Sequence, residues 1–166
     1  MINSSRFIES FLQKRRFKKV LPFLKGDILD FGGNDGELEQ YVKGSYTLVN
    51  YDHAPMENKT FDTIVALAVI EHIDIPDVFA VVGKFKPKLK PGGTIFLTTP
   101  TRMAKPVLEF LAFINMVDKE NIEEHKHYWN KKEIYELAVK NGFEIKEYRK
   151  FQFGFNQFAV LQHRQK

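Results

Sequence analysis

The side chains best suited to acid–base chemistry in this sequence are three histidines. His72 directly follows Glu71, and His125 and His127 lie in residues 123–130, a stretch rich in titratable and aromatic side chains. A neutral imidazole accepts a proton near neutral pH, so each of these histidines is a candidate general base, with local packing as the alternative. His125 and His127 alternate as on an extended segment, with no cysteine nearby and no helical H-E-x-x-H spacing, so no metal site is predicted.

A glycine-rich stretch, residues 27–41, has the pattern of a nucleotide-cofactor turn. The apolar run Ile28–Phe31 is typical of a buried strand; it ends in glycines and is followed by residues that can start a helix. Glycines let the backbone approach a ligand, and a following helix presents free N–H groups. A dinucleotide fingerprint beginning at Gly32 would need glycine where Asn34 and Glu37 stand, so a nicotinamide cofactor fits poorly.

Length and composition favour a single domain. The chain has 166 residues, 43% of them hydrophobic, which is enough for one core. The absence of cysteine excludes disulfides, thiolate metal sites and a cysteine nucleophile. No apolar run approaches the roughly 20 residues of a membrane span, and the start of the chain lacks the features of a signal peptide. We therefore expect one cytoplasmic domain over residues 1–166.

Residues 4–25 predict an amphipathic helix that lies on the sheet or covers the cofactor. Its apolar residues recur at helical spacing, and residues 1–25 hold seven Lys and Arg against one Glu, a net charge of +6. A basic face of this kind can meet nucleic acid, anionic lipid or an acidic substrate. No aromatic stacking pattern accompanies the charges, which favours a solvated face. The basic face consists of Lys14, Arg15, Arg16, Lys18 and Lys19.

The remaining elements alternate between strands and helices. Residues 37–42 predict a short helix, and residues 46–51 a strand that ends in Asp52, 22 residues beyond Asp30. A carboxylate at such a strand end can accept both hydroxyls of a ribose, whereas a turn-starting Asp is the structural alternative. The continuous apolar run within 61–73 predicts a central parallel strand covered on both faces. Beyond it we expect helices at 76–86, 106–117 and 131–139, a turn at 89–93, and strands at 94–100, 143–151 and 155–162.

Three motifs together resemble those of class I S-adenosylmethionine (SAM)-dependent methyltransferases, specifically the small-molecule, type 11-like branch. Asp30, Gly32 and Gly36 fit D-x-G-x-G-x-G, with Asn34 at the central glycine, and Asn is among the few residues that accept a left-handed backbone. Residues 61–76 resemble F-D-x-I followed by E-H-x-x-x-P, and residues 89–93 read L-K-P-G-G. The resemblance covers residues 27–162. It implies an α/β, Rossmann-like three-layer sandwich with a mostly parallel sheet and an antiparallel C-terminal hairpin strand.

One family unit is missing from the pattern. Only nine residues separate Asp52 from Asp62, too few for the helix and third strand that typical members place there. The chain therefore looks like a short form reduced by one βα unit, although the strand ending at Asp52 could alternatively be the third strand. In the family, residues 101–130 correspond to a lid-like insertion over the substrate. A dimer contact or packing against the N-terminal helix are the alternatives for the apolar helix within it.

The resemblance also implies a site. SAM would be the cofactor and S-adenosylhomocysteine (SAH) the product, with Leu67 and Ala68 on the methionine side and His53 near the adenine. Methyl transfer needs a positioned acceptor and removal of at most one proton, the role open to His72, His125 and His127. The expected cofactor-binding residues are Asp30, Gly32, Gly33, Asn34, Gly36, Asp52, His53, Leu67 and Ala68.

The predicted function is SAM-dependent methyl transfer to oxygen or nitrogen of a small-molecule acceptor with an apolar or aromatic part. The chain has no N-P-P-Y sequence, and without cysteine the covalent route to C5 of cytosine is excluded, so nucleic-acid substrates are disfavoured. Two alternatives stay open: a non-catalytic SAM- or SAH-binding protein and a basic nucleic-acid-binding module. The sequence leaves open a monomer or a homodimer.

Overall fold

A six-stranded sheet organises the computed structural model, which describes residues 4–50, 58–114 and 124–164. The strand order is β2-β1-β3-β4-β6-β5. The first four neighbours run parallel, and β6 runs antiparallel to both β4 and β5. The prediction of a mostly parallel sheet with an antiparallel C-terminal strand is confirmed. The strands are β1 (Ile28–Phe31), β2 (Tyr46–Val49), β3 (Phe61–Leu67), β4 (Leu89–Pro100), β5 (Phe143–Phe151) and β6 (Asn156–His163).

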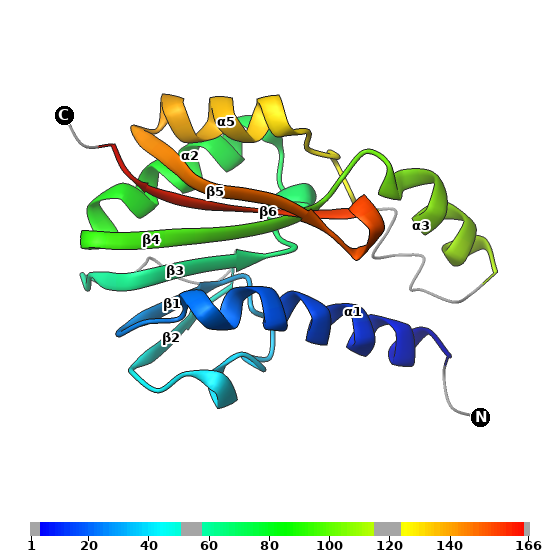
Figure 1. Cartoon of the computed structure of the whole chain (residues 1–166), viewed down its shortest axis with the longest axis horizontal. Helices are drawn as coiled ribbons and strands as arrows, with labels where there is room; N and C mark the ends of the chain where they lie inside the picture. Colours follow the sequence, from blue (N-terminus) through cyan, green and yellow to red (C-terminus); the bar gives the residue numbers. More distant parts are fainter. Residues whose placement is uncertain (1–3, 51–57, 115–123, 165–166) are drawn as a thin grey trace.

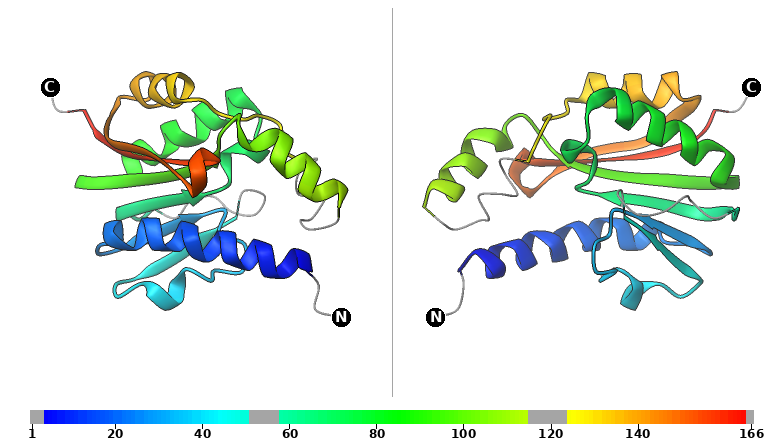
Figure 2. Two further views of the ribbon diagram at one scale, coloured as in Figure 1. Left: turned by 45° about the vertical axis from the view of Figure 1, so that its right-hand side comes forward. Right: turned by 180° about the vertical axis from the view of Figure 1, so that it is seen from behind.

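Helices cover both faces of this sheet and make the predicted three layers. Helix α1 (Ser4–Val20) lies along one face, whereas α2 (Ile75–Phe85) and α5 (Lys131–Lys140) cover the other (Figure 1). Helix α3 (Ala104–Phe113) stands beyond the carboxyl ends of the parallel strands and faces the N-terminal half of α1 in both views of Figure 2. None of the helices in the described ranges has the length and apolarity needed to cross a lipid bilayer.

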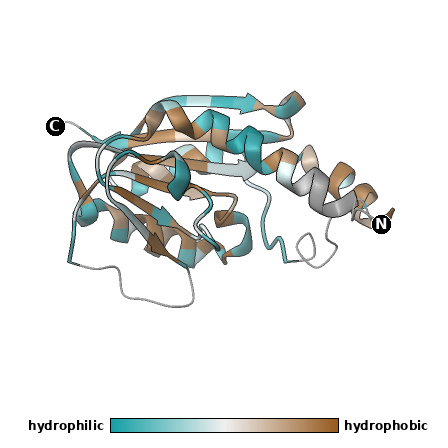
Figure 3. Ribbon diagram, turned by 90° about the horizontal axis from the view of Figure 1, so that it is seen from below, coloured by the Kyte–Doolittle hydropathy of each residue, from teal (hydrophilic) through white to brown (hydrophobic). Residues whose placement is uncertain are grey.

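The core forms two layers because successive strand residues point to opposite faces of the sheet. Leu29 and Ile64 pack under α2 and α5, and their neighbours Ile28 and Val65 pack with Val20 of α1. Hydrophobic residues accordingly dominate the central strands (Figure 3). This two-sided burial explains the continuous apolar runs that predicted central strands.

The glycine-rich stretch ends differently from the prediction. Residues 37–42 do not form an α-helix; a single 3-10 turn, Glu39–Tyr41, follows the glycines. The amides of Gly36 and Glu39 are already used in tight turns to the carbonyls of Gly33 and Gly36, and β2 begins at Tyr46. Too few residues remain for a helical nucleus to propagate. The glycine turn is therefore followed by a 3-10 turn rather than by the N-terminus of an α-helix.

The sheet bears on three further predictions. β2 pairs directly with β1 in parallel, so the strand that leads to Asp52 takes the second-strand position and the third-strand alternative is wrong. Among the described residues β2 is the edge of the sheet, as expected of a form that lacks one βα unit. The predicted turn at 89–93 is instead part of β4, which bulges there against β3, with Gly92 at a φ of 78°.

Candidate active site

A cavity of about 480 Å³ opens at the carboxyl ends of the parallel strands, between α1 and α3. In open α/β sheets this end is the usual place for a ligand. The walls come from the glycine turn after β1, the end of β3, the 3-10 turn Ile70–His72, α1 and α3. Segments far apart in the sequence therefore meet around one space.

The glycine turn forms one wall and is held tightly against the sheet. Gly32 has a φ of 76°, and a Cβ there would lie 2.6 Å from the side chain of Val69. Asn34 takes the left-handed conformation, with a φ of 50°, that the sequence analysis allowed for. Its amide donates to Asn50 Oδ1, and Asn50 Nδ2 donates back to the Asn34 carbonyl, each at 3.0 Å. This reciprocal pair ties the turn to the end of β2.

Asp30 lies beneath the turn with only 2% of its surface exposed. Tyr46 Oη donates to its carboxylate at 2.6 Å. Burial raises the pKa of Asp30 to about 6, although the Tyr46 hydrogen bond opposes that rise. A Cβ on Gly33 would lie 2.3 Å from the Asp30 carboxylate, so the turn can close over Asp30 only with glycine at this position.

The end of β3 supplies the floor. Leu67 and Ala68 both line the cavity, and Ala68 has a φ of 58°, an unfavourable value for a residue with a Cβ. The Ala68 amide donates to the backbone carbonyl and the hydroxyl of Thr98, both at 3.0 Å. These contacts with β4 hold the strained residue in place.

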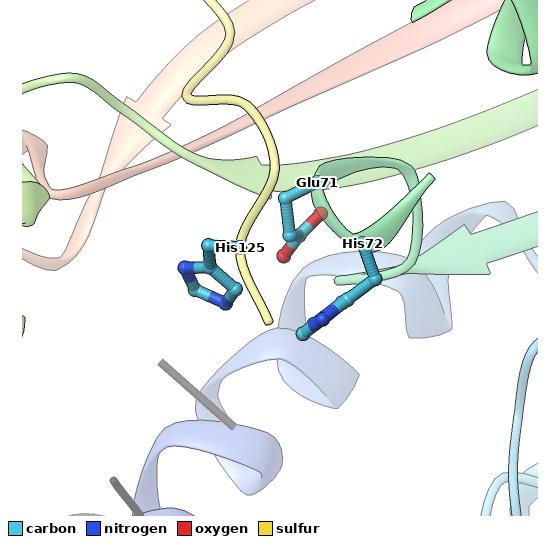
Figure 4. A group of neighbouring side chains, drawn as sticks. All are labelled: Glu71, His72 and His125. Atoms are coloured by element: carbon cyan, nitrogen blue, oxygen red, sulfur yellow. The ribbon is translucent and has the colours of Figure 1, made fainter. Parts of the chain in front are cut away.

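Glu71, His72 and His125 form a compact cluster at the cavity (Figure 4). One donor atom from each of the three side chains lies within 4.8 Å of the others, and the two imidazole centroids are 4.7 Å apart. Burial raises the pKa of the Glu71 carboxyl to about 7. Burial also lowers the pKa of His72, although the charge of Glu124 opposes that change. Burial, with the nearby His72 and Arg16, lowers the pKa of His125 to about 4. Both imidazoles are therefore neutral at neutral pH and each offers a lone pair, whereas Glu71 has the pKa best matched to accepting a proton there.

Backbone hydrogen bonds bring His125 to this cluster. The amides of Lys126 and His127 donate to the Glu71 carbonyl at 2.8 and 3.2 Å. The indole of Trp129, which is 1% exposed, donates to the Ile70 carbonyl at 3.3 Å. The arrangement fixes the extended segment 124–130 against the 3-10 turn that carries Glu71 and His72.

The predicted site residues fall into three groups. Gly36 is buried beside Tyr46 behind the turn and does not line the cavity, and His127 places Nε2 3.2 Å from Glu133 Oε2, away from the other two histidines. Asp52 and His53 lie outside the described residues. The cavity brings together Asp30, Gly32, Gly33, Asn34, Leu67, Ala68, His72 and His125.

The contribution of two arginines of helix α1 to the cavity walls was not predicted from the sequence. Arg15 and Arg16 of α1, expected on a solvated basic face, line the cavity, as does Phe11. The other three residues of that face are exposed and do not line the cavity, as expected: Lys14, Lys18 and Lys19. The sequence feature that could have indicated this is the spacing of Phe11 and Arg15, which lie one helical turn apart. In the structure the Arg15 guanidinium lies 4.9 Å from the centre of the Phe11 ring. Glu71 also lines the cavity; the E-H pair of the motif had left it either at a helix start or facing the acceptor.

The fold is α/β, and its cavity lies at the carboxyl ends of the parallel strands, beside a glycine turn. The chain belongs to the methyltransferase domain family, whose model matches residues 5–148. This is the class I SAM-dependent family that the three motifs resemble.

Known proteins agree with this assignment. The ubiquinone biosynthesis O-methyltransferase of Rickettsia canadensis (strain McKiel) is 30% identical over 117 residues, 64% of this chain and 48% of that protein. The chain thus spans about half the length of this curated relative. A structure of an O-methyltransferase family protein from Burkholderia thailandensis shares the fold with a TM-score of 0.68 at 14% identity, covering 92% of this chain and 56% of that one. A SAM-dependent methyltransferase from Methanosarcina mazei gives a TM-score of 0.59 at 16% identity, with coverages of 87% and 96%.

Replacing Trp129 with Phe tests the anchor of segment 124–130. The variant keeps an aromatic ring but leaves the buried Ile70 carbonyl without its indole donor, which should lower the free energy of unfolding by about 1–3 kcal/mol. Urea denaturation followed by circular dichroism measures this loss. Tyr135→Phe, at an exposed aromatic residue of α5, is the matched control and should stay within about 0.5 kcal/mol of the wild type. Equal losses in the two variants would contradict the anchoring role.

Replacing Asp30 with Asn tests the buried carboxylate. Its pKa is about 6 in the folded protein against 3.8 ordinarily, so the folded state holds the proton more tightly and the stability due to Asp30 falls as pH rises from about 4 to 6. Asp30→Asn removes that fall, and its advantage over the wild type should grow across this window to at most about 3 kcal/mol. Urea denaturation at pH 4, 5, 6 and 7.5 measures the difference, and a difference that is constant with pH would contradict the burial argument.

Proposed function

We propose that the chain binds SAM in this cavity and transfers its methyl group to an oxygen or nitrogen atom of a small-molecule acceptor, with SAH as the product. The observation that carries the proposal is that one cavity joins the glycine turn of the methyltransferase motif to a cluster of buried proton-accepting groups. A cofactor on the turn and an acceptor beside the cluster would then share one space. Holding two reactants in line is most of what methyl transfer asks of a protein.

The cofactor half of the proposal rests on the turn and the strand ends. Gly32 and Gly33 expose backbone where a Cβ would collide with Val69 or Asp30, so the ligand can approach the main chain closely. Leu67 and Ala68 would flank the methionine part. By resemblance, Asp52 would accept the ribose hydroxyls and His53 would lie near the adenine. Gly36 would shape the turn from behind, without touching the ligand.

The acceptor half rests on the opposite walls. Phe11 of α1 and Val107, Leu108 and Leu111 of α3 give this part of the cavity an apolar lining, which suits an acceptor with an apolar or aromatic part. The acceptor atom would attack the methyl carbon while the carbon–sulfur bond breaks, and its proton would pass to the Glu71–His72–His125 cluster. His127 contacts Glu133 instead, so the proposal gives it no direct contact with the acceptor.

On this proposal α1 and residues 101–130 belong to the same methyltransferase domain as the sheet and cover its ligand. Arg15 and Arg16 line the cavity, so the α1 basic face offers no observation that favours a nucleic-acid-binding function. The remaining alternative, a non-catalytic SAM- or SAH-binding protein, differs from the proposal in turnover rather than in binding.

Calorimetric titration of the purified chain with SAM, SAH and NAD tests the cofactor. We expect binding of SAM and SAH in the micromolar range and none of NAD. Asp52→Ala should weaken SAM at least tenfold, whereas Asp77→Ala, at an exposed acid of α2, should leave the affinity unchanged. Absence of SAM binding at millimolar ligand would overturn the proposal. Binding without SAH production from any hydroxyl- or amine-bearing acceptor in a screen would support the non-catalytic alternative.

Gly33→Ala gives a second test of the cofactor site. The new Cβ must displace either the Asp30 carboxylate or the turn, so SAM affinity should fall at least tenfold by the same calorimetric titration. Gly92→Ala is the matched control, because its Cβ would meet nothing within 4 Å and Gly92 does not line the cavity. Its strained φ lowers stability by about 1–2 kcal/mol, but its SAM affinity should equal that of the wild type. Unchanged affinity in Gly33→Ala would place the cofactor elsewhere.

A further inference from the structure

Glu71, His72 and His125 have the composition and spacing of a metal-binding triad. Two imidazoles and one carboxylate form a common protein ligand set for Zn²⁺ and for non-haem Fe²⁺. The three donor atoms already lie within 4.8 Å of one another, close enough for small side-chain rotations to bring them onto one ion. We propose that Glu71, His72 and His125 bind one divalent transition-metal cation, with Zn²⁺ as the representative ion, at the acceptor side of the cavity.

The burial of the Glu71 carboxylate independently favours a bound cation. Glu71 is 1% exposed, and its Oε2 has no hydrogen-bond partner among the described residues. A buried carboxylate oxygen without a donor is costly, and a bound cation removes that cost. Figure 4 shows the carboxylate turned toward the space that the two imidazoles border.

Contacts within the protein also preorganise the cluster. Glu71 and His72 are adjacent on one 3-10 turn, and the Glu71 carbonyl accepts the two amides that position His125. Tyr128 Oη lies 3.1 Å from Nδ1 of His125, and outer contacts of this kind orient a ligating imidazole. The sequence predicted no metal site because His125 and His127 lack the spacing of a helical zinc motif. The triad proposed here differs from that expectation, because it combines His125 with Glu71 and His72 rather than with His127.

The chemistry of the walls favours a transition metal over Mg²⁺. Arg16 lines the same cavity, and its positive charge opposes any cation held by charge alone. Imidazole nitrogens bind Zn²⁺ and Fe²⁺ well, whereas Mg²⁺ prefers oxygen ligands and keeps its water. The triad should therefore discriminate between Zn²⁺ and Mg²⁺.

The inference deepens the proposed function, on which its catalytic meaning rests. Three protein ligands leave coordination positions open toward the cavity, where a hydroxyl of the acceptor can bind. With the ion bound, the lone pairs of the triad would be taken by the metal, so the triad would no longer accept the proton itself. The cation would instead lower the pKa of the bound hydroxyl, its proton would pass to solvent, and the oxygen would attack the methyl carbon as the carbon–sulfur bond breaks. The substrate class is then a hydroxyl-bearing acceptor, such as a phenol or a catechol, and the product is its methyl ether.

Titration of the chelator-treated chain with Zn²⁺ tests the site without any catalytic assay. We expect one equivalent to bind with micromolar or tighter affinity, and Mg²⁺ to show no binding at the same concentrations. Glu71→Gln and His125→Ala should each weaken Zn²⁺ at least tenfold. His163→Gln removes a histidine of β6 outside the cluster and should bind Zn²⁺ as the wild type does. Circular dichroism confirms that each variant is folded, and His72→Asn replaces any variant that is not.

Absorption spectra of the Co²⁺-loaded chain add a signature of coordination. Visible bands that change in Glu71→Gln and His125→Ala but not in His163→Gln support the triad. Zn²⁺ affinity equal in all variants, or no uptake by the wild type, overturns it. A SAM titration run with and without Zn²⁺ separates the two proposals: SAM binding without Zn²⁺ uptake removes only the metal site, and Zn²⁺ uptake at the triad without SAM binding removes only the proposed function.

Discussion

The candidate site depends on the carbonyl groups of one 3-10 turn. The Glu71 carbonyl accepts the amides of Lys126 and His127, and the neighbouring Ile70 carbonyl accepts the Trp129 indole. More than fifty residues of chain separate this turn from the segment that it binds. The entropy lost in bringing the two together must therefore be offset by the buried contacts between them. Trp129 supplies much of that burial, and Gln157 Nε2 of β6 fixes the Trp129 carbonyl at 2.6 Å. A core residue and the chemistry of the cavity are thus coupled through the backbone.

The turn after β1 shows a second way of placing backbone near a ligand. No α-helix follows it, so the dipole and free amides of a helix N-terminus do not contribute. Rigidity comes instead from the reciprocal Asn34–Asn50 pair and from the close approach of Gly33 to Asp30. This close fit buries the Asp30 carboxylate and raises its pKa. Burying the carboxylate lowers local stability, as is typical of functional sites.

The sequence predicted what depends on local pattern and missed what depends on tertiary contact. Two-sided apolar runs identified the central strands, and Asn34 was recognised as tolerant of the left-handed turn. The helix expected at 37–42 failed because its length, rather than its composition, was limiting. No periodicity could show that His125 lies beside His72 while His127 turns to Glu133, since this follows from backbone hydrogen bonds across the fold. The cavity side of Arg15 and Arg16 likewise depends on where α1 lies over the sheet.

In this short form of the fold, Tyr46 of the edge strand β2 has two structural roles. β2 has only four residues and, among the described strands, pairs with β1 alone. A short edge strand limits unwanted pairing with other chains but is also held by few hydrogen bonds. Tyr46 begins this strand and is also the donor to the buried Asp30. Fraying of β2 would therefore remove the hydrogen-bond donor to Asp30 and loosen the Asn34–Asn50 pair at the same time. The shape of the glycine turn thus depends on the stability of this sheet edge.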